Sequence, residues 1–486
     1  MMFRQRRMQI ACVLSTFLTI TMLAAMQVAN ISPAHAAGYT VTVTPSQKYQ
    51  NIQGWGTSMA WWANIIGGWS NSKRTALADA LYNPTTGIGL NVLRYNFGAD
   101  GPGNVCHNQM KAGRNVPSFE PTKGNYVWTN DANQLWVAQA AKARGANVFE
   151  GFVNSPPAWM LDNSCTAGGA VHKDNISPAN YGEFASYIAT IAKHFHDSFG
   201  ITLQTVEPFN EPSASWWNSS ATQEGMYVAR STQNAIIPLV ASELSKNGAS
   251  AYTGVSSPDD NGVAGSNTDY NAYSSSTKAN LVQWNTHTYS GSDADRAYAY
   301  TNIGQKDNKR LWMSEWGVGS QGSPIGAALR LSSQVLDDEQ HLHPASWVAW
   351  QAVNEAGDTA NSVWGLAYRD ANDNISYPAR YYAMGNYSKY IRQGAQMIGN
   401  SDASSFTTYD ASAKTLTIVT TNSSTSSETI SYNLANFSNA GSAATPHQTS
   451  ASENLKQLAN IGISGKKFSA TLPAQSITTF VIPNVA

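Results

Sequence analysis

The chain has 486 residues and a formal net charge of −1, and charged side chains make up only 13% of it. That share lies below the roughly 25% typical of soluble proteins, and there is no basic excess to attract nucleic acid. The composition therefore indicates a protein that handles neutral ligands, and no nucleic-acid partner is expected. A chain of this length exceeds one ordinary hydrophobic core, so two domains are expected.

The N-terminus has the pattern of a secretory signal peptide. Three arginines precede an apolar run over residues 10–26, and Ala34-His35-Ala36 supplies a small-residue cleavage site. Removal of residues 1–36 leaves 27 basic side chains against 31 acidic ones, a net charge of −4. An uncleaved membrane anchor is the alternative. We therefore expect a secreted, extracellular protein that is monomeric and free of the membrane once the signal is cleaved.

Two cysteines, Cys106 and Cys165, remain beyond that cleavage site, and both lie in segments expected to be loops. Export permits a disulfide between them, and two free thiols are the alternative. No group of Cys and His residues has the spacing of a metal site, so neither a metal nor an organic cofactor is expected.

The middle of the chain alternates strand-like and helical segments. Eight short apolar segments are expected to be strands, namely 53–58, 91–97, 147–153, 202–209, 252–256, 283–287, 310–314 and 345–351. Helical segments separate several of them, for example 130–144, 178–199 and 323–338. The alternation predicts an α/β fold, a (β/α)8 TIM barrel over residues 53–388. An open doubly wound sheet is less suitable, because no glycine-rich phosphate loop follows any strand.

The last hundred residues differ in composition. All 15 tryptophans lie between Trp55 and Trp364, and none follows residue 391. Short alternating strands are expected instead at 405–409, 415–421, 429–434 and 476–482. This pattern predicts a β-sandwich domain over residues 389–486, fused to the barrel. A short strand within residues 37–52 is expected to join it.

Two strand ends carry the candidate chemistry. The strings Val206-Glu207-Pro208-Phe209-Asn210-Glu211-Pro212 and Leu311-Trp312-Met313-Ser314-Glu315-Trp316-Gly317 each run from a strand through a glutamate into a turn. In a barrel the carboxyl ends of the strands converge on one mouth, so Glu211 and Glu315 should share a cleft. Glycoside hydrolysis needs such a pair, one carboxyl protonated and the other ionised. We assign Glu211 as acid/base and Glu315 as nucleophile.

Neighbouring residues are predicted to support this pair. Asn210 should bind the sugar 2-hydroxyl, whereas Glu207 should point the opposite way by strand alternation. Arg94 is a candidate to hold the nucleophile ionised, or a structural ion pair. The strand-end residues His287 and Tyr289 are candidates for contact with the nucleophile or the sugar. Aromatic platforms for sugar rings are expected among Trp61, Trp62, Trp159 and Trp350, with Trp216 and Trp217 as further candidates.

Taken in order, these motifs resemble glycoside hydrolase family 30. The resemblance rests on Gln53-Gly54-Trp55-Gly56, Arg94-Tyr95-Asn96, the run Ser155–Met160, Asn210-Glu211-Pro212, Ser314-Glu315-Trp316-Gly317 and the closing run Tyr382–Arg392. It implies a retaining (β/α)8 hydrolase with a fused β-sandwich. It also implies an acid/base after the fourth strand, at Glu211, and a nucleophile after the seventh, at Glu315.

The segment Gly54–Asn64 looks like the branch of that family that attacks β-1,6-galactan side chains of arabinogalactan-type polysaccharides. The resemblance therefore implies an endo-β-1,6-galactanase. Other activities of the family, such as β-1,6-glucanase, xylanase or exo-acting β-glycosidase, are the alternatives. A non-catalytic carbohydrate-binding protein is the alternative from a different class.

Overall fold

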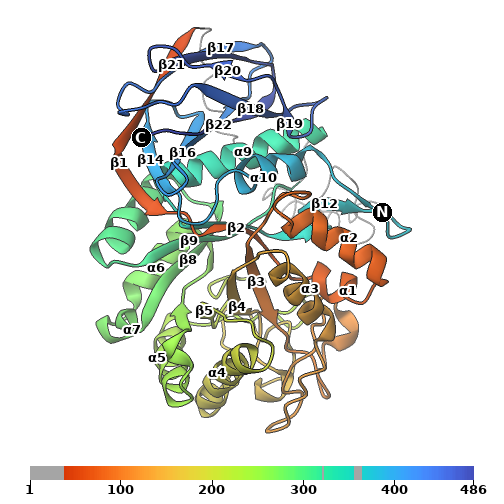
Figure 1. Cartoon of the computed structure of the whole chain (residues 1–486). Coiled ribbons are helices and arrows are strands. Elements are labelled where there is room, and N and C mark those ends of the chain that lie inside the picture. Colours follow the sequence, from red (N-terminus) through yellow and green to blue (C-terminus); the bar gives the residue numbers. More distant parts are fainter. Residues whose placement is uncertain (1–37, 320–321, 355–363) are drawn as a thin grey trace, which may run out of the picture.

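The computed structural model describes residues 38–319, 322–354 and 364–486, which form a barrel and a separate C-terminal β domain (Figure 1). The predicted signal peptide therefore lies outside the described residues. Within the described ranges, no helix combines the length and apolar character needed to cross a membrane.

The first sheet is a closed parallel barrel of eight strands, which confirms the predicted fold. Each strand pairs with its neighbours in parallel, and β6 pairs with β8 to close the ring. The strands are β2 (Gly54–Ser58), β3 (Val92–Phe97), β4 (Val148–Val153), β5 (Thr205–Glu207), β6 (Gly254–Ser256), β8 (Leu281–Ser290), β9 (Arg310–Trp316) and β10 (Ser346–Ala349). All eight fall on the predicted segments. A short strand that the sequence did not suggest, β7 (Asp260–Gly262), pairs with β8 at the barrel mouth.

Alternation along β3 sends successive side chains to opposite sides of the barrel wall. Tyr95 faces outward and meets Phe195 edge-on, with 4.8 Å between the ring centroids. Val92 faces inward, in an apolar cluster with residues of three other strands, Val148, Trp312 and Val348. Arg94, two residues further along β3, also faces inward, and it begins a polar layer above this apolar floor. The barrel interior is thus apolar near the strand starts and charged near their ends.

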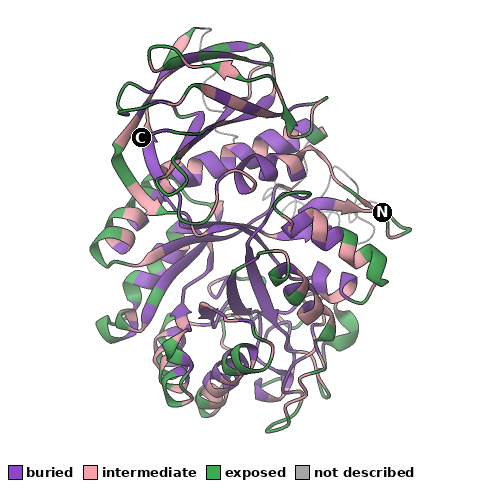
Figure 2. Ribbon diagram, in the orientation of Figure 1, coloured by how far each residue is buried: buried purple, intermediate pink, exposed green. Residues whose placement is uncertain are grey.

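Helices cover the outside of the barrel. They include α1 (Trp62–Ile66), α2 (Asn71–Tyr82), α3 (Ala132–Lys142), α4 (Tyr181–Asp197), α5 (Arg230–Lys246), α6 (Val263–Ala272), α7 (Ser275–Ala279), α8 (Asp293–Tyr298) and α9 (Pro324–His341). The three helices predicted from sequence correspond to α3, α4 and α9. Figure 2 shows the barrel strands largely buried, although Val282 of β8 is exposed, whereas the outer helices carry both buried and exposed residues. Burial of one helical stripe is what anchors such helices to a sheet.

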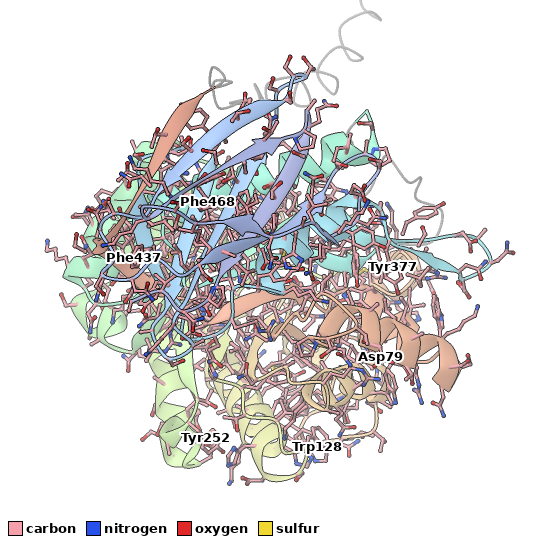
Figure 3. All side chains as sticks on the ribbon, turned by 45° about the horizontal axis from the view of Figure 1, so that its top comes forward. Asp79, Trp128, Tyr252, Tyr377, Phe437 and Phe468 are labelled. Atoms are coloured by element: carbon pink, nitrogen blue, oxygen red, sulfur yellow. A yellow bond between two sulfur atoms is a disulfide. The ribbon has the colours of Figure 1, made fainter. Side chains whose placement is uncertain are left out.

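The C-terminal domain is an all-β unit completed by the N-terminal strand. β1 (Tyr39–Asn51) pairs antiparallel with β14 (Gln396–Asn400) and parallel with β17 (Glu428–Asn433). The remaining strands are β15 (Ser405–Asp410), β16 (Thr415–Asn422), β18 (Ala443–Thr449), β19 (Lys456–Gln457), β20 (Ile461–Gly462), β21 (Lys467–Leu472) and β22 (Ser476–Ile482). Phe437 and Phe468 both belong to its own apolar core (Figure 3).

Two helices make part of the contact between the barrel and the β domain (Figure 1). In α9, the Ser332 hydroxyl lies 2.7 Å from the Thr421 hydroxyl of β16. In α10 (Ala379–Ser388), Asn386 Nδ2 donates to Thr479 Oγ1 of β22 at 2.9 Å. We propose domain boundaries of 53–388 and 389–486, because α10 ends at Ser388 and the next strand, β14, belongs to the second sheet. Residues 37–52 are assigned to the β domain, because β1 pairs with β14 and β17.

A disulfide joins Cys106 and Cys165 at the rim where the strand-to-helix loops emerge. Cys106 lies in the loop after β3 and Cys165 in the loop after β4. The loop after β5 joins them, because Gln109 Nε2 donates to the carbonyl oxygens of Ser219 at 2.7 Å and Ala221 at 2.8 Å. Three consecutive loops are therefore tied into one wall of the barrel mouth.

We expect the double variant Cys106→Ala/Cys165→Ala to be less stable than the parent by about 4 kcal/mol, because the disulfide restricts the unfolded chain over a sequence separation of 59 residues. Thermal and urea unfolding of the variant, compared with the oxidised and the reduced parent, would measure this. The reduced parent is the control and should resemble the variant. Equal midpoints for the variant and the oxidised parent would contradict the expectation.

Candidate active site

A cleft of about 540 Å³ opens where the carboxyl ends of the barrel strands converge. Six residues predicted for the site line it: Trp61, Asn210, Glu211, Tyr289, Glu315 and Trp350. Trp216, a further platform candidate, lines it as well. The other lining residues in the described chain are Lys111, Arg114, Gln223, Asn261, Gln351 and Trp364. Two separate strand ends thus bring both candidate carboxyls to one opening.

Glu211 is held at the cleft by its backbone. β5 ends at Glu207, and the chain then turns so that Glu211 adopts a left-handed φ of 48°. Its N–H donates to the carbonyl of Asp259 at 2.9 Å, and its own carbonyl accepts from Trp217 Nε1 at 2.9 Å. Non-glycine residues in this region of φ cluster at functional sites, where surrounding contacts impose the conformation.

The Glu211 carboxylate accepts hydrogen bonds at both oxygens. Oε1 lies 3.1 Å from His287 Nδ1 and accepts from Asn261 Nδ2 at 2.6 Å. Oε2 accepts from Trp216 Nε1 at 3.1 Å. Each donor comes from a different loop or strand end, so the position of this side chain depends on the assembled barrel mouth.

Glu315 is the penultimate residue of β9 and faces the same space. Arg94 Nη1 donates to its Oε2 at 2.8 Å, and the Tyr289 hydroxyl donates to its Oε1 at 3.2 Å. His287 Nδ1 lies 3.5 Å from the same Oε1. Burial raises the pKa of Glu315 to about 7, against the opposing influence of His287 and Arg94.

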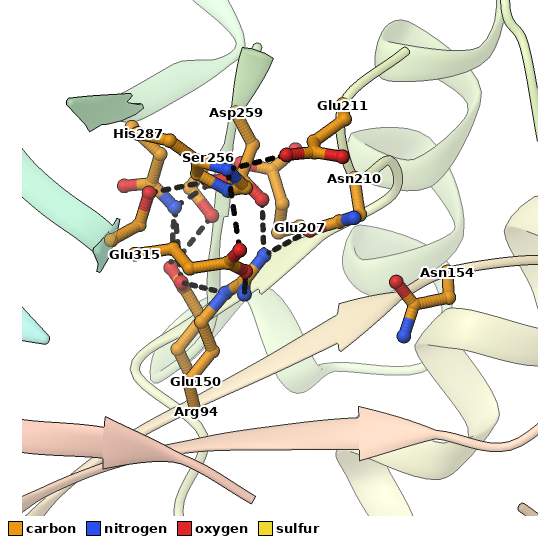
Figure 4. A network of polar contacts seen from close by, with 12 residues as sticks. Arg94, Glu150, Asn154, Glu207, Asn210, Glu211, Ser256, Asp259, His287 and Glu315 are labelled. Atoms are coloured by element: carbon orange, nitrogen blue, oxygen red, sulfur yellow. Dashed lines mark hydrogen bonds and ion pairs between the residues drawn. The ribbon is translucent and has the colours of Figure 1, made fainter. Parts of the chain in front are cut away.

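A buried ion cluster supports both carboxyls from below (Figure 4). Arg94 Nη2 donates to Asn210 Oδ1 at 2.8 Å and also pairs with Asp259. His287 Nε2 lies 3.4 Å from Asp259 Oδ1. Burial alone would raise the pKa of Asp259, but Arg94 and His287 lower it below its ordinary value. Burial likewise opposes the charge on His287, but Glu315 and Asp259 raise its pKa to about 10.

Arg94 and His287 are therefore placed under the carboxyls rather than on the cleft surface. Both are fully buried, and each contacts groups from other strands. The prediction that Arg94 contacts the Glu315 carboxylate agrees with this arrangement. His287 Nδ1 lies near both carboxyls, 3.1 Å from Glu211 Oε1 and 3.5 Å from Glu315 Oε1.

Two further carboxyls lie deeper in the barrel. Asn285 Nδ2 donates to Glu150 Oε1 at 3.0 Å and to Glu207 Oε2 at 3.2 Å. Burial raises the pKa of both carboxyls above the ordinary range. The prediction that Glu207 points away from Asn210 is wrong, because both side chains face the neighbourhood of Arg94. Strand alternation does not extend to Asn210, since β5 ends at Glu207.

The tryptophan predictions divide into cleft residues and packing residues. Trp61 and Trp350 line the cleft and meet edge-on, with 6.0 Å between ring centroids and 81° between ring planes. The prediction for Trp62 is wrong. It begins α1, donates to the carbonyl of Ser58 at 2.8 Å and is buried in the barrel's main apolar core.

The prediction that Trp159 is an aromatic platform in the cleft is also wrong. Its Nε1 donates to the carbonyl of Glu120 at 2.9 Å, and its ring is partly buried against the barrel's main apolar core, away from the cleft-lining residues. Trp217 is buried as well, whereas its neighbour Trp216 is exposed at the cleft.

Sequence reasoning missed Asp259 and Asn261, which contact the ion cluster and Glu211. Both follow β6, which ends at Ser256. The rule that located Glu211 and Glu315, a polar residue just beyond a strand end, would have singled them out. Lys111 and Arg114 were also missed, and they enter the cleft from the loop that contains Cys106.

Glu211, His287 and Glu315 also form a group that could hold a metal ion, because one ligand atom from each lies within 4.8 Å of the others. Metal binding requires a neutral imidazole. The pKa of His287 is raised to about 10, so a metal would have to displace the imidazole proton, which the surrounding carboxylates stabilise. The charge pattern therefore favours a protonated histidine between two carboxyl groups.

Two facing carboxyls in an aromatic-walled cleft at the mouth of a (β/α)8 barrel define a glycoside hydrolase. Comparison with known proteins gives the family. The family model described as "O-Glycosyl hydrolase family 30" matches residues 38–287. The endo-beta-1,6-galactanase of Hypocrea rufa is 33% identical over 493 aligned residues, which cover 95% of this chain and 98% of that protein. The chain therefore belongs to glycoside hydrolase family 30.

Further similarities concern one more relative and one solved structure. The exo-beta-1,6-galactobiohydrolase of Bifidobacterium longum subsp. longum is 26% identical over 92% of this chain and 40% of its own length. The catalytic domain of GH30 xylanase C from Talaromyces cellulolyticus superposes with a TM-score of 0.72, at 22% identity over 91% of this chain and 99% of that one. At such identity the superposition shows a shared fold.

We expect Arg94→Met to lower the free energy of unfolding at pH 7 by about 3–5 kcal/mol, because it leaves buried carboxylates without their cation. The lowered pKa of Asp259 contributes stability that is present above its unfolded value of about 3.9 and is lost as the pH falls through the folded value. The difference between variant and parent should therefore narrow toward acid. Urea unfolding at pH 7 and at about pH 2, well below the unfolded pKa of Asp259, measures the narrowing.

Arg144→Met is the matched control for this experiment. Arg144 Nε pairs with Asp79 Oδ1 at 2.7 Å, but the aspartate is half exposed, so the cost should be under about 1 kcal/mol. Equal effects of the two substitutions at pH 7 would contradict the importance given to the buried cluster.

Proposed function

We propose that this chain is a secreted, retaining endo-β-1,6-galactanase in which Glu315 is the nucleophile and Glu211 the acid/base. The observation that carries the proposal is the placement of both carboxyls around His287, with one ligand atom of each within 4.8 Å. An inverting enzyme separates its carboxyls by roughly 6.5–9.5 Å to admit a water, whereas a retaining enzyme needs only about 5–5.5 Å. The close approach favours retention.

In the first step of this mechanism, a Glu315 oxygen attacks the anomeric carbon and the glycosidic C–O bond breaks. Arg94 and protonated His287 favour the ionised Glu315 that the attack requires, against the effect of burial on its pKa. Glu211 gives its proton to the departing oxygen. In the second step, Glu211 takes a proton from water as that water displaces Glu315 from the sugar, and the anomeric configuration is retained.

Asn210 and Tyr289 complete the site in this proposal. Arg94 can only donate hydrogen bonds, so Asn210 presents Oδ1 to Arg94 and keeps Nδ2 for the sugar 2-hydroxyl. The Tyr289 hydroxyl donates to Glu315 Oε1 and so orients the nucleophile. The Trp61–Trp350 corner would supply an apolar surface for one face of a sugar ring.

The choice of β-1,6-galactan rests on the relatives. The protein that is 33% identical over 95% of this chain is an endo-beta-1,6-galactanase, and a second relative is an exo-beta-1,6-galactobiohydrolase. Secretion is proposed from the N-terminal pattern of residues 1–36. Endo action is proposed because the first of these relatives is an endo-acting enzyme. The size distribution of the oligosaccharides released from a polymer would test it.

We expect Glu315→Gln to lower kcat by at least about 10⁴-fold with the fold intact, because an amide cannot form the covalent glycosyl intermediate. Glu211→Ala should lose about 10²–10⁴-fold on the polysaccharide, and azide should rescue it on a substrate with a good leaving group. Kinetics and product NMR measure both. Near-parental activity of Glu315→Gln would remove that residue from the nucleophile role.

We expect the enzyme to release short galacto-oligosaccharides from β-1,6-galactan, with the β-anomer formed first in NMR spectra. Activity on β-1,6-glucan and on xylan should be lower by at least about 10²-fold, because a site that hydrogen-bonds the axial 4-hydroxyl leaves polar groups unpaired with other sugars. Product analysis on the three polysaccharides is the measurement. Preferential cleavage of xylan would overturn the substrate while leaving the two-glutamate mechanism in place.

A further inference from the structure

Glu211 projects from a tight turn, residues 211–214, that follows β5. The turn is closed because the N–H of Ala214 donates to the carbonyl of Glu211 at 3.0 Å. The hydroxyl of Ser213, at the third position of the turn, donates to Asp269 Oδ2 at 2.8 Å. Asp269 belongs to α6, so the turn that carries the proposed acid/base is tied to a helix on the outside of the barrel.

Asp269 is fully buried and holds this region by more than one contact. Arg230 Nε, from α5, donates to its Oδ1 at 2.5 Å, and Gln233 Nε2 donates to its Oδ2 at 3.3 Å. The same Gln233 Nε2 donates to the carbonyl of Val228 at 2.9 Å, and the N–H of Val228 donates to the carbonyl of Pro212 at 2.8 Å. Asp269 therefore reaches the turn by two routes, directly through a hydroxyl and indirectly through Gln233.

The same helix also contacts the loop after β6. Gly265 of α6 packs against Asp260 so closely that a Cβ at the glycine would lie 2.4 Å from Asp260 Oδ2. Asp260 Oδ1 accepts from the N–H of Asn261 at 3.0 Å, and Asn261 Nδ2 donates to Glu211 Oε1 at 2.6 Å. One helix thus backs both the turn that carries Glu211 and the loop whose asparagine holds one of its oxygens.

We propose that Asp269 is a positioning residue that fixes the turn 211–214 through Ser213 and so aims the Glu211 carboxyl at the departing glycosidic oxygen. The proposal rests on the proposed function, in which Glu211 is the acid/base. Proton transfer requires the two heavy atoms to approach within roughly 2.6–3.2 Å, so a small displacement of the turn slows it. Among the described residues Asp269 is not part of the cleft lining, so its action on the reaction is indirect.

The dependence of the rate on the leaving group separates misplacement of the acid from a general loss of structure. The ratio kcat/KM covers the steps up to departure of the leaving group, when Glu211 gives up its proton. A phenyl leaving group needs that proton, whereas a dinitrophenyl leaving group departs without it. Suitable substrates are the phenyl and dinitrophenyl glycosides of the shortest oligosaccharide that the parent enzyme releases.

We expect Ser213→Ala to lower kcat/KM about 10-fold on the phenyl glycoside and less than about 2-fold on the dinitrophenyl glycoside, because it removes only the hydroxyl that links the turn to Asp269. Asp269→Asn should show the same pattern. The double variant should lose no more than the more impaired single variant, since both substitutions break one contact. If Asp269→Asn does not fold, Ser213→Ala decides the proposal by itself.

Ser405→Ala is the matched control. The Ser405 hydroxyl also donates to a buried carboxylate, Asp402 Oδ2 at 2.6 Å, but both residues lie in the β domain. This substitution should lower the thermal midpoint and leave kcat/KM on both glycosides unchanged. Equal losses of Ser213→Ala on the two glycosides, or no loss on the phenyl glycoside, would overturn the proposal. Equal losses of Glu211→Ala on the two glycosides would instead overturn the underlying acid/base assignment.

Discussion

The site depends on the buried guanidinium of Arg94. Its Nη1 atom holds Glu315 at 2.8 Å, and its Nη2 atom holds Asn210 at 2.8 Å and pairs with Asp259. Removing a charge from water costs several kcal/mol, and only well-placed partners compensate for it. Groups from four different barrel strands or their loops must therefore meet at one point. The barrel must therefore close correctly for Arg94 to reach the proposed nucleophile, Glu315.

The distribution of charge inside the barrel follows from this cluster. Below Arg94 the interior is filled by Val92, Val148, Trp312 and Val348, and above it the cleft opens to solvent. Glu150 and Glu207 lie between these zones, and burial raises the pKa of both. A raised pKa weakens the competition of these two carboxyls for Arg94, whose Nη atoms contact Glu315 and Asp259 directly. The buried cation is thus directed toward the proposed nucleophile.

The cleft walls are loops with little apolar core of their own, so cross-links between loops hold them in place. The disulfide between Cys106 and Cys165 and the contacts of Gln109 unite three loops that carry Lys111, Arg114 and Trp216 to the opening. The β domain lies away from these loops, against α9 and α10. It therefore contacts the barrel without covering the strand-end loops that shape the cleft.

The sequence by itself determined the eight strands, the all-β tail and the positions of Glu211 and Glu315. Apolar periodicity and strand ends are local properties, and parallel strands bring their carboxyl ends to one side. Only the tertiary structure decided which way a side chain points once its strand has ended, as Glu207 and Asn210 show. It also decided that Trp61 reaches the cleft while Trp62 and Trp159 pack elsewhere, because ring burial depends on partners distant in sequence.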